Sequence, residues 1–277
     1  MTTITASEVN KLRKLTGAGM MDCKKALVES NGDFDIAIDY LRKKGQKVSA
    51  KRADREANEG AIIATTSSDQ TTGVIVELNC ETDFVAKNED FVSFAHALAS
   101  VALENKPATI DELMALSIDG TPISTKLEEY VGKIGEKIGI GTYVILNANN
   151  VVSYIHSGNR IGVLVELNNA ASEANTSAGK DVAMQIAAMN PVAVTKDEVD
   201  ETTIAREIEI GKEQARAEGK PEAMLEKIAM GKLNKFFKEN TLLAQPFVKD
   251  SGSTVAQMLQ TTEVGLTVNS FKRIALA

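Results

Sequence analysis

The sequence predicts an α+β fold made of three parts: an N-terminal three-helix module, a duplicated core of antiparallel sheets with helices, and an inserted helical hairpin. A repeated segment predicts the duplicated core, because GVIVELN at residues 73–79 recurs as GVLVELN at residues 162–168. Each copy is rich in β-branched residues and precedes a helical pattern, as expected for two related halves. The length of 277 residues also exceeds the roughly 100–200 residues of an average domain.

The N-terminal module is predicted over residues 1–45 as three short helices. The first begins at a capping box formed by Thr5 and Glu8, in which the Thr5 side chain can accept from the backbone N–H of Glu8. The second helix spans about residues 22–30, and the third ends at Gly45. A module of this size buries little apolar surface, so we expect it to be a docking unit rather than a site of chemistry.

A loop with two adjacent methionines follows the first helix. The helical spacing of Leu12 and Leu15 places them on the inward side of that helix. The loop then carries Gly19, Met20 and Met21, at the place where the ubiquitin-associated-type bundles that this module resembles present an apolar tip. Methionines adapt well to a partner surface when they are exposed, but they can also fold back into the core. The sequence leaves both alternatives open.

A basic linker is predicted over residues 46–58. Residues 1–56 contain 12 Lys/Arg and 8 Asp/Glu, whereas residues 57–277 contain 19 and 30, and seven of the cations lie within residues 42–55. This cluster is either a solvated tether or exposed helix, or a nucleic-acid patch whose affinity would depend strongly on salt. Acidic residues interrupt the cluster and no aromatic residue accompanies it, so we expect no direct binding of nucleic acid.

The first core half is predicted over residues 59–141, and its most informative segment follows the repeated strand. There the chain reads CETDFVAKN, in which Thr82 and Asp83 form a natural N-cap pair for a helix. Phe84 would then project from a preorganised helix start. Alternatively, Phe84 fills the space between the sheet and the next helix. A second, glycine-rich helical pattern covers residues 126–138.

The second core half is predicted over residues 142–195 and 241–277, with the helical hairpin inserted at residues 196–240. Its expected elements are strands at residues 143–146, 152–155, 162–168 and 264–268 and helices at residues 182–189 and 253–260. His156 lies in the tip between two of these strands. Because loop tips often carry contacts, His156 is a candidate contact residue.

Several classes of chemistry find no support in the residue types. The two histidines and two cysteines show neither metal-ligand spacing nor a disulfide framework. There is no GxxxxGK[S/T] phosphate loop, and no carboxylate pair stands out for acid–base catalysis. We therefore expect a protein that is not an enzyme and uses no cofactor of its own. The alternative is an enzyme with its site in the cleft between the duplicated halves.

The location expected for the protein is the cytoplasm. No segment approaches the roughly 18 apolar residues of a membrane span. Residues 1–7 lack the basic start and apolar core of a signal peptide. The low cysteine content also fits a reducing compartment. Because no apolar span was found, no membrane contact is expected.

Four segments of the chain, in order, are similar to the signatures of bacterial translation elongation factor Ts. They are TGAGMMDCKKAL at residues 16–27, NCETDFVAKN at 79–88, HSGNRIGVLV at 156–165 and QPFV at 245–248. The resemblance covers essentially the whole chain. It implies guanine-nucleotide exchange on elongation factor Tu, with GDP and Mg²⁺ bound on the partner's side.

The resemblance also implies roles for individual residues. Thr82, Asp83 and Phe84, here called the wedge, would enter between two helices of the partner's GTPase domain, close to its Mg²⁺ and phosphate site. The implied docking residues are Leu12, Met20 and Met21 against another face of that domain and His156 against a further domain. The helical hairpin resembles the coiled-coil protrusion of the family, which implies a possible homodimer.

Overall fold

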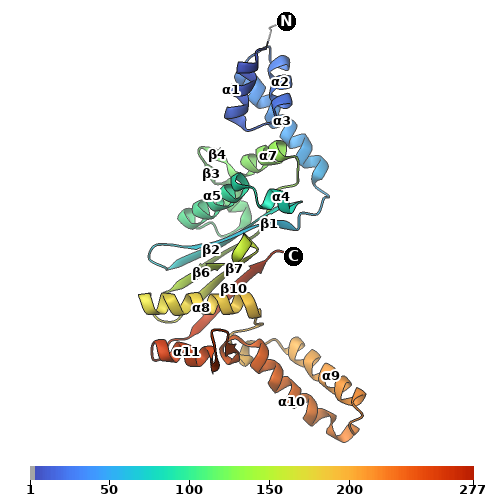
Figure 1. The fold of residues 1–277 in the computed structure, drawn as a ribbon, viewed down its shortest axis with the longest axis vertical. Coiled ribbons are helices and arrows are strands. Elements are labelled where there is room, and N and C mark those ends of the chain that lie inside the picture. The colour runs from blue at the N-terminus through green and yellow to red at the C-terminus, as the bar shows by residue number, and fades with distance from the viewer. Residues whose placement is uncertain (1–3) are drawn as a thin grey trace.

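The computed structural model describes residues 4–277. Residues 1–3, part of the opening segment considered for a signal peptide, lie outside this range. The molecule is elongated, with the N-terminal module at one end and the helical hairpin at the other (Figure 1). Across residues 4–277, none of the helices combines the length and the apolar character needed to cross a bilayer.

The N-terminal module consists of α1 (Ala6–Thr16), α2 (Met20–Glu29) and the first part of α3 (Phe34–Arg52). The predicted capping box is confirmed, because Thr5 Oγ1 accepts from the Glu8 N–H at 3.2 Å and Glu8 Oε2 accepts from the Thr5 N–H at 2.7 Å. A left-handed Gly17 ends α1. The buried core of the module is Val9, Leu12, Cys23, Ala26, Leu27 and Ala37.

The prediction that this third helix ends at Gly45 is wrong. Helix α3 continues to Arg52. Gly45 lies where α3 crosses α7 (Ile123–Ile134), and a Cβ atom there would be 2.8 Å from the carbonyl oxygen of Glu128. A Cβ atom on Gly132 of α7 would be 2.8 Å from the Cα of Gly45. Both glycines therefore permit close helix packing. Residues 46–52 of the linker predicted at 46–58 therefore belong to a helix. This agrees with the alternative that the basic cluster is an exposed helix.

Two three-stranded antiparallel sheets form the core. The first has the order β1-β2-β5 and the second β10-β7-β6. Their bounds are β1 (Glu59–Thr66), β2 (Thr72–Cys80), β5 (Gly139–Asn147), β6 (Val151–Ile155), β7 (Ile161–Leu167) and β10 (Val268–Ala275). The repeated segments are thus the central strands β2 and β7. A central strand is paired on both edges and covered on both faces, which explains why both copies are almost entirely apolar before their Glu.

Two predicted strands are corrected by the sheet topology. The segment at residues 143–146, assigned to the second half, lies in β5 and pairs with β2 of the first sheet. The last strand, predicted at residues 264–268, begins only at Val268. Gly265 has a φ of +84° and forms a turn, and Leu266 is buried beneath it. Strand pairing is decided by contacts distant in sequence, so local patterns did not place these strands.

The two sheets pack face to face, with helices on their outer faces (Figure 1). Helix α5 (Glu89–Asn105) covers the first sheet and α8 (Glu173–Met189) the second. Between the sheets lie the buried side chains of Ile62, Ala64, Ile75, Val151, Leu164 and Leu276. A Cβ on Gly73 would be 2.6 Å from Val151 and one on Gly162 would be 2.6 Å from Ile62. Apolar side chains thus fill the interior between the two sheets.

The helical hairpin predicted within residues 196–240 is present as α9 (Glu201–Ala217) and α10 (Glu222–Asn240). Gly211 packs on Ala229, with its Cβ position 3.2 Å from the alanine methyl group. The remaining elements are α4 (Asp83–Ala86), α6 (Ile110–Ala115), β3 (Ser117–Ile118), β4 (Thr121–Pro122), β8 (Pro246–Phe247), β9 (Asp250–Thr254), α11 (Val255–Thr262) and three short 3₁₀ turns.

Candidate functional site

The wedge lies at the end of the central strand β2, where the chain enters the single-turn helix α4. Thr82 is the N-cap of α4, and its hydroxyl oxygen accepts from the Val85 N–H at 3.5 Å. Phe84 is 84% exposed, so it projects from the helix start, and the alternative that it fills the space between the sheet and the next helix is wrong. Val85 and Ala86 pack against the core beneath. The turn is therefore anchored on one side and presents its aromatic ring on the other.

Asp83 precedes Phe84 in the chain and carries a negative charge at neutral pH. Its carboxylate accepts a hydrogen bond from Lys87 Nζ at 2.6 Å, an i,i+4 ion pair along the helix. This hydrogen bond lowers the pKa of Asp83 below its usual value. Both side chains are exposed, so the pair is accessible to a partner.

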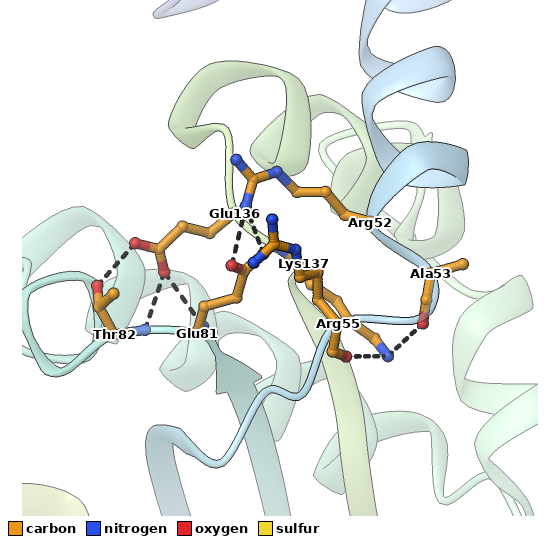
Figure 2. A network of polar contacts seen from close by, with 7 residues as sticks. All are labelled: Arg52, Ala53, Arg55, Glu81, Thr82, Glu136 and Lys137. Carbon is orange, nitrogen blue, oxygen red and sulfur yellow. Dashed lines mark hydrogen bonds and ion pairs between the residues drawn. The ribbon is translucent and has the colours of Figure 1, made fainter.

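Glu136, in the loop after α7, holds the start of the wedge (Figure 2). Its Oε2 accepts from the backbone N–H groups of Glu81 at 3.1 Å and Thr82 at 3.0 Å. Its Oε1 accepts from the hydroxyl of Thr82 at 2.7 Å. One carboxylate thus binds three donors of the turn, although Glu136 and Thr82 are 54 positions apart in the chain.

A second set of contacts joins the same turn to the end of α3 (Figure 2). The carboxylate of Glu81 accepts from Arg52 at 2.7 and 2.9 Å and from the backbone N–H of Lys137 at 2.7 Å. The Lys137 hydrogen bond, with the Arg52 guanidinium, lowers the pKa of Glu81. Lys137 Nζ donates to the carbonyl oxygens of Ala53 and Arg55 at 2.7 and 2.9 Å. No local sequence pattern marks this network, because its members are far apart in the chain.

Cys80, the last residue of β2, is buried under the wedge. Its thiol donates to the carbonyl oxygen of Thr82 at 3.2 Å. Burial, with a contribution from nearby Glu136, raises the pKa of Cys80 to about 12. The thiol is therefore protonated at neutral pH and is not a nucleophile.

The docking residues of the N-terminal module divide into exposed and buried ones. Met20 and Met21 are 52% and 72% exposed at the start of α2, so the alternative that they belong to the core is wrong. Leu12, in contrast, is completely buried in the module core and is not a surface contact in this structure. Leu15, expected to face inward, is 64% exposed. Leu15, Met20 and Met21 are therefore all exposed apolar residues of the module, together with Val28 and Ile36.

His156 lies in the exposed tip between β6 and β7. Its Nδ1 is 3.1 Å from the hydroxyl of Tyr154, within hydrogen-bonding distance. The candidate residues thus occupy three separate parts of the molecule: the module, the first sheet and the second sheet. No group of three or more potential metal ligands occurs among the residues that the structure describes.

Comparisons with known proteins agree with the resemblance of the motifs. The family model for elongation factor TS matches residues 81–277. The chain is 57% identical to elongation factor Ts of Cytophaga hutchinsonii, covering 100% of both chains, and 56% identical to that of Amoebophilus asiaticus, covering 98% of each. It is 55% identical to elongation factor Ts of Christiangramia forsetii, again over 100% of both chains. With a family match over most of its length and full-length relatives, the chain belongs to the elongation factor Ts family.

Proposed function

We propose that this chain is a guanine-nucleotide exchange factor that binds elongation factor Tu in its GDP-bound state and promotes GDP release during translation elongation. The observation that carries the proposal is the exposed Phe84 ring, held next to Asp83 on a short helix with an anchored base. Membership in the family supplies the identity of the partner.

The wedge acts by disturbing the partner's Mg²⁺ and phosphate site. Mg²⁺ requires near-ideal octahedral geometry and keeps several of its waters. A small displacement of the groups that order those waters therefore weakens the binding of the ion. Phe84 supplies a rigid apolar body for insertion between two helices of the GTPase domain. Asp83, held ionised by Lys87, adds a negative charge beside that body.

The energy for this disturbance comes from docking elsewhere. A nanomolar GDP complex corresponds to about 12 kcal/mol, and contacts with this chain must offset much of it. We assign these contacts to Met20 and Met21 on the module and to His156 on the second half. By linkage, this chain lowers the affinity of elongation factor Tu for GDP by the same factor by which GDP lowers the affinity of elongation factor Tu for this chain. Incoming GTP can then displace the factor in turn.

The test is stopped-flow release of a fluorescent GDP from elongation factor Tu, with the wild-type chain, Phe84→Ala and the control Val264→Ala. Val264 is also an exposed apolar residue, at 90%, but lies after α11. We expect Phe84→Ala to lower the maximal release rate more than it weakens binding, and the control to match the wild type. Equal losses in rate and binding would contradict the wedge, and no acceleration by the wild type would contradict the function.

A further inference from the structure

We propose that Glu136 is a positioning residue for nucleotide exchange: its carboxylate holds the turn at Glu81 and Thr82 so that α4 presents Phe84 in one fixed direction. The inference rests on the proposed exchange function. It concerns a residue whose hydrogen bonds go to Glu81 and Thr82 rather than to Phe84 or Asp83, and it is drawn from the hydrogen bonds in Figure 2.

Helix α4 cannot fix its own direction. It has only four residues, Asp83–Ala86, and a single helical turn is unstable in isolation because nucleation costs more than one hydrogen bond returns. Its direction must therefore come from its attachments. On the side of the core these are the apolar contacts of Val85 and Ala86. On the side of the incoming chain they are the hydrogen bonds to Glu136.

Glu136 suits this role because both of its oxygens are used on neighbouring donors. Two backbone N–H groups bind Oε2 and one hydroxyl binds Oε1, so the carboxylate resists rotation of the turn about any single bond. Hydrogen bonds to an ionised acceptor are roughly twice as strong as neutral ones. Gly135, left-handed with a φ of 83°, ends α7 and lets the next residue leave the helix axis.

The carboxylate also determines how Thr82 caps α4. A hydroxyl has one proton, and here that proton is donated to Glu136, which leaves an oxygen lone pair for the Val85 N–H. If Glu136 lost its carboxylate, the hydroxyl could rotate and donate elsewhere. The N-cap and the start of α4 would then be less ordered, with Phe84 only two residues away.

The neighbouring contacts extend this control to the docking module. Glu81 and Lys137 join the turn to the end of α3, and α3 is the helix that leads back into the module. Between these points α3 rests closely on α7 through Gly45. The wedge and the exposed methionines are therefore held at a set separation before any partner binds. Such preorganisation avoids an ordering cost at the moment of binding.

The experiment compares Glu136→Ala, Glu136→Gln and the control Glu104→Ala in the fluorescent-GDP assay, alone and combined with Phe84→Ala. Glu104 is an exposed glutamate in α5. We expect Glu136→Ala to lower the maximal release rate by about tenfold or more, because misplacing a group by about 1 Å can cost on the order of 100-fold. The concentration giving half the maximal rate should change little. Glu136→Gln should recover part of the rate, since its amide oxygen still accepts from both N–H groups, whereas its amide NH2 cannot accept the proton of the Thr82 hydroxyl.

The double variant separates positioning from a general loss of structure. If Glu136 acts through Phe84, Glu136→Ala should have no further effect once Phe84 is alanine. Additive losses, or a wild-type rate in Glu136→Ala, would overturn the inference while leaving exchange by the wild type intact. Glu136→Ala could also lose its far-ultraviolet dichroism or its thermal transition. In that case Glu136→Gln decides: the inference is overturned unless this variant is folded and releases GDP faster than Glu136→Ala. A wild-type chain without activity would instead overturn the proposed function.

Discussion

Phe84 and the two methionines at the start of α2 are large apolar side chains left in water by a fold that buries most others. Full burial of such a side chain contributes roughly 1.5–3 kcal/mol to the free energy of folding. The protein does not gain this stabilisation at these positions. Each lies at a helix start, α4 for Phe84 and α2 for Met20 and Met21. A rigid backbone with an exposed apolar side chain is suited to entering a preformed pocket of a partner.

We predict that the methionines contribute to binding rather than to the release step. The double variant Met20→Ala/Met21→Ala should raise the concentration needed for half-maximal exchange by about tenfold, as expected for two contacts worth about 1 kcal/mol or less each. The maximal rate should stay close to that of the wild type. The measurement is the concentration dependence of GDP release, with Met189→Ala, an exposed methionine of α8, as the control. A lower maximal rate with unchanged half-saturation would contradict this assignment.

At the scale of elements, α3 connects the docking module to the wedge, and its crossing with α7 is the closest helix contact on this path. Gly45 and Gly132 face each other there without side chains. Glycine is the least favourable residue except proline in a helix interior, by about 1 kcal/mol relative to alanine. The α3–α7 contact must therefore recover that cost through packing.

We predict opposite effects for two glycine-to-alanine substitutions in helices. Gly45→Ala should lower the free energy of unfolding by roughly 1–3 kcal/mol, because its methyl group would meet the backbone of Glu128 at 2.8 Å. Gly231→Ala in α10 should raise it by about 0.5–1 kcal/mol, since the added Cβ would meet no atom within 4 Å outside the adjoining turns of its own helix and only helix propensity changes. Urea unfolding measures both. A stabilised Gly45→Ala would show that the helices can separate without loss.

The network at the end of α3 should make part of the stability depend on pH. The pKa of Glu81 is lowered in the folded protein, so its contribution is present above the usual value of 4.5 and is lost as the pH falls through the lower, folded-state pKa. We predict that Glu81→Gln is less stable than the wild type at neutral pH and that the difference shrinks below about pH 4. Urea unfolding across this range measures it. A difference that does not vary with pH would contradict the linkage.

At the scale of the whole molecule, the contact regions are spread along its length. The module carries Met20 and Met21, the first sheet leads into Phe84, and the second sheet carries His156 at its β6–β7 tip. The two sheets are locked together by reciprocal contacts at Gly73 and Gly162. A partner with several domains can therefore be held at more than one place by a frame of fixed geometry.

Local sequence signals predicted the parts of this frame that depend on local chemistry. The capping box of α1, the repeated central strands and the hairpin α9–α10 were predicted because their signals lie within a few residues. The length of α3 and the sheet of β5 were predicted wrongly, since both depend on packing against segments distant in sequence. The role of Glu136 had no local signal, because it and Thr82 meet only through the fold.

The hairpin lies at the end of the molecule opposite the docking module, so a homodimer formed through it would leave both the module and helix α4 free (Figure 1). We propose this dimer from the family resemblance and from the exposed apolar residues Ile210, Met224 and Met230 on the hairpin. Sedimentation velocity should show a concentration-dependent dimer that Met224→Glu/Met230→Glu dissociates, because burying unpaired carboxylates at an apolar contact is costly. The dissociated variant should keep the wild-type maximal rate of GDP release. A wild-type chain that stays monomeric at all concentrations would contradict the dimer without affecting the wedge.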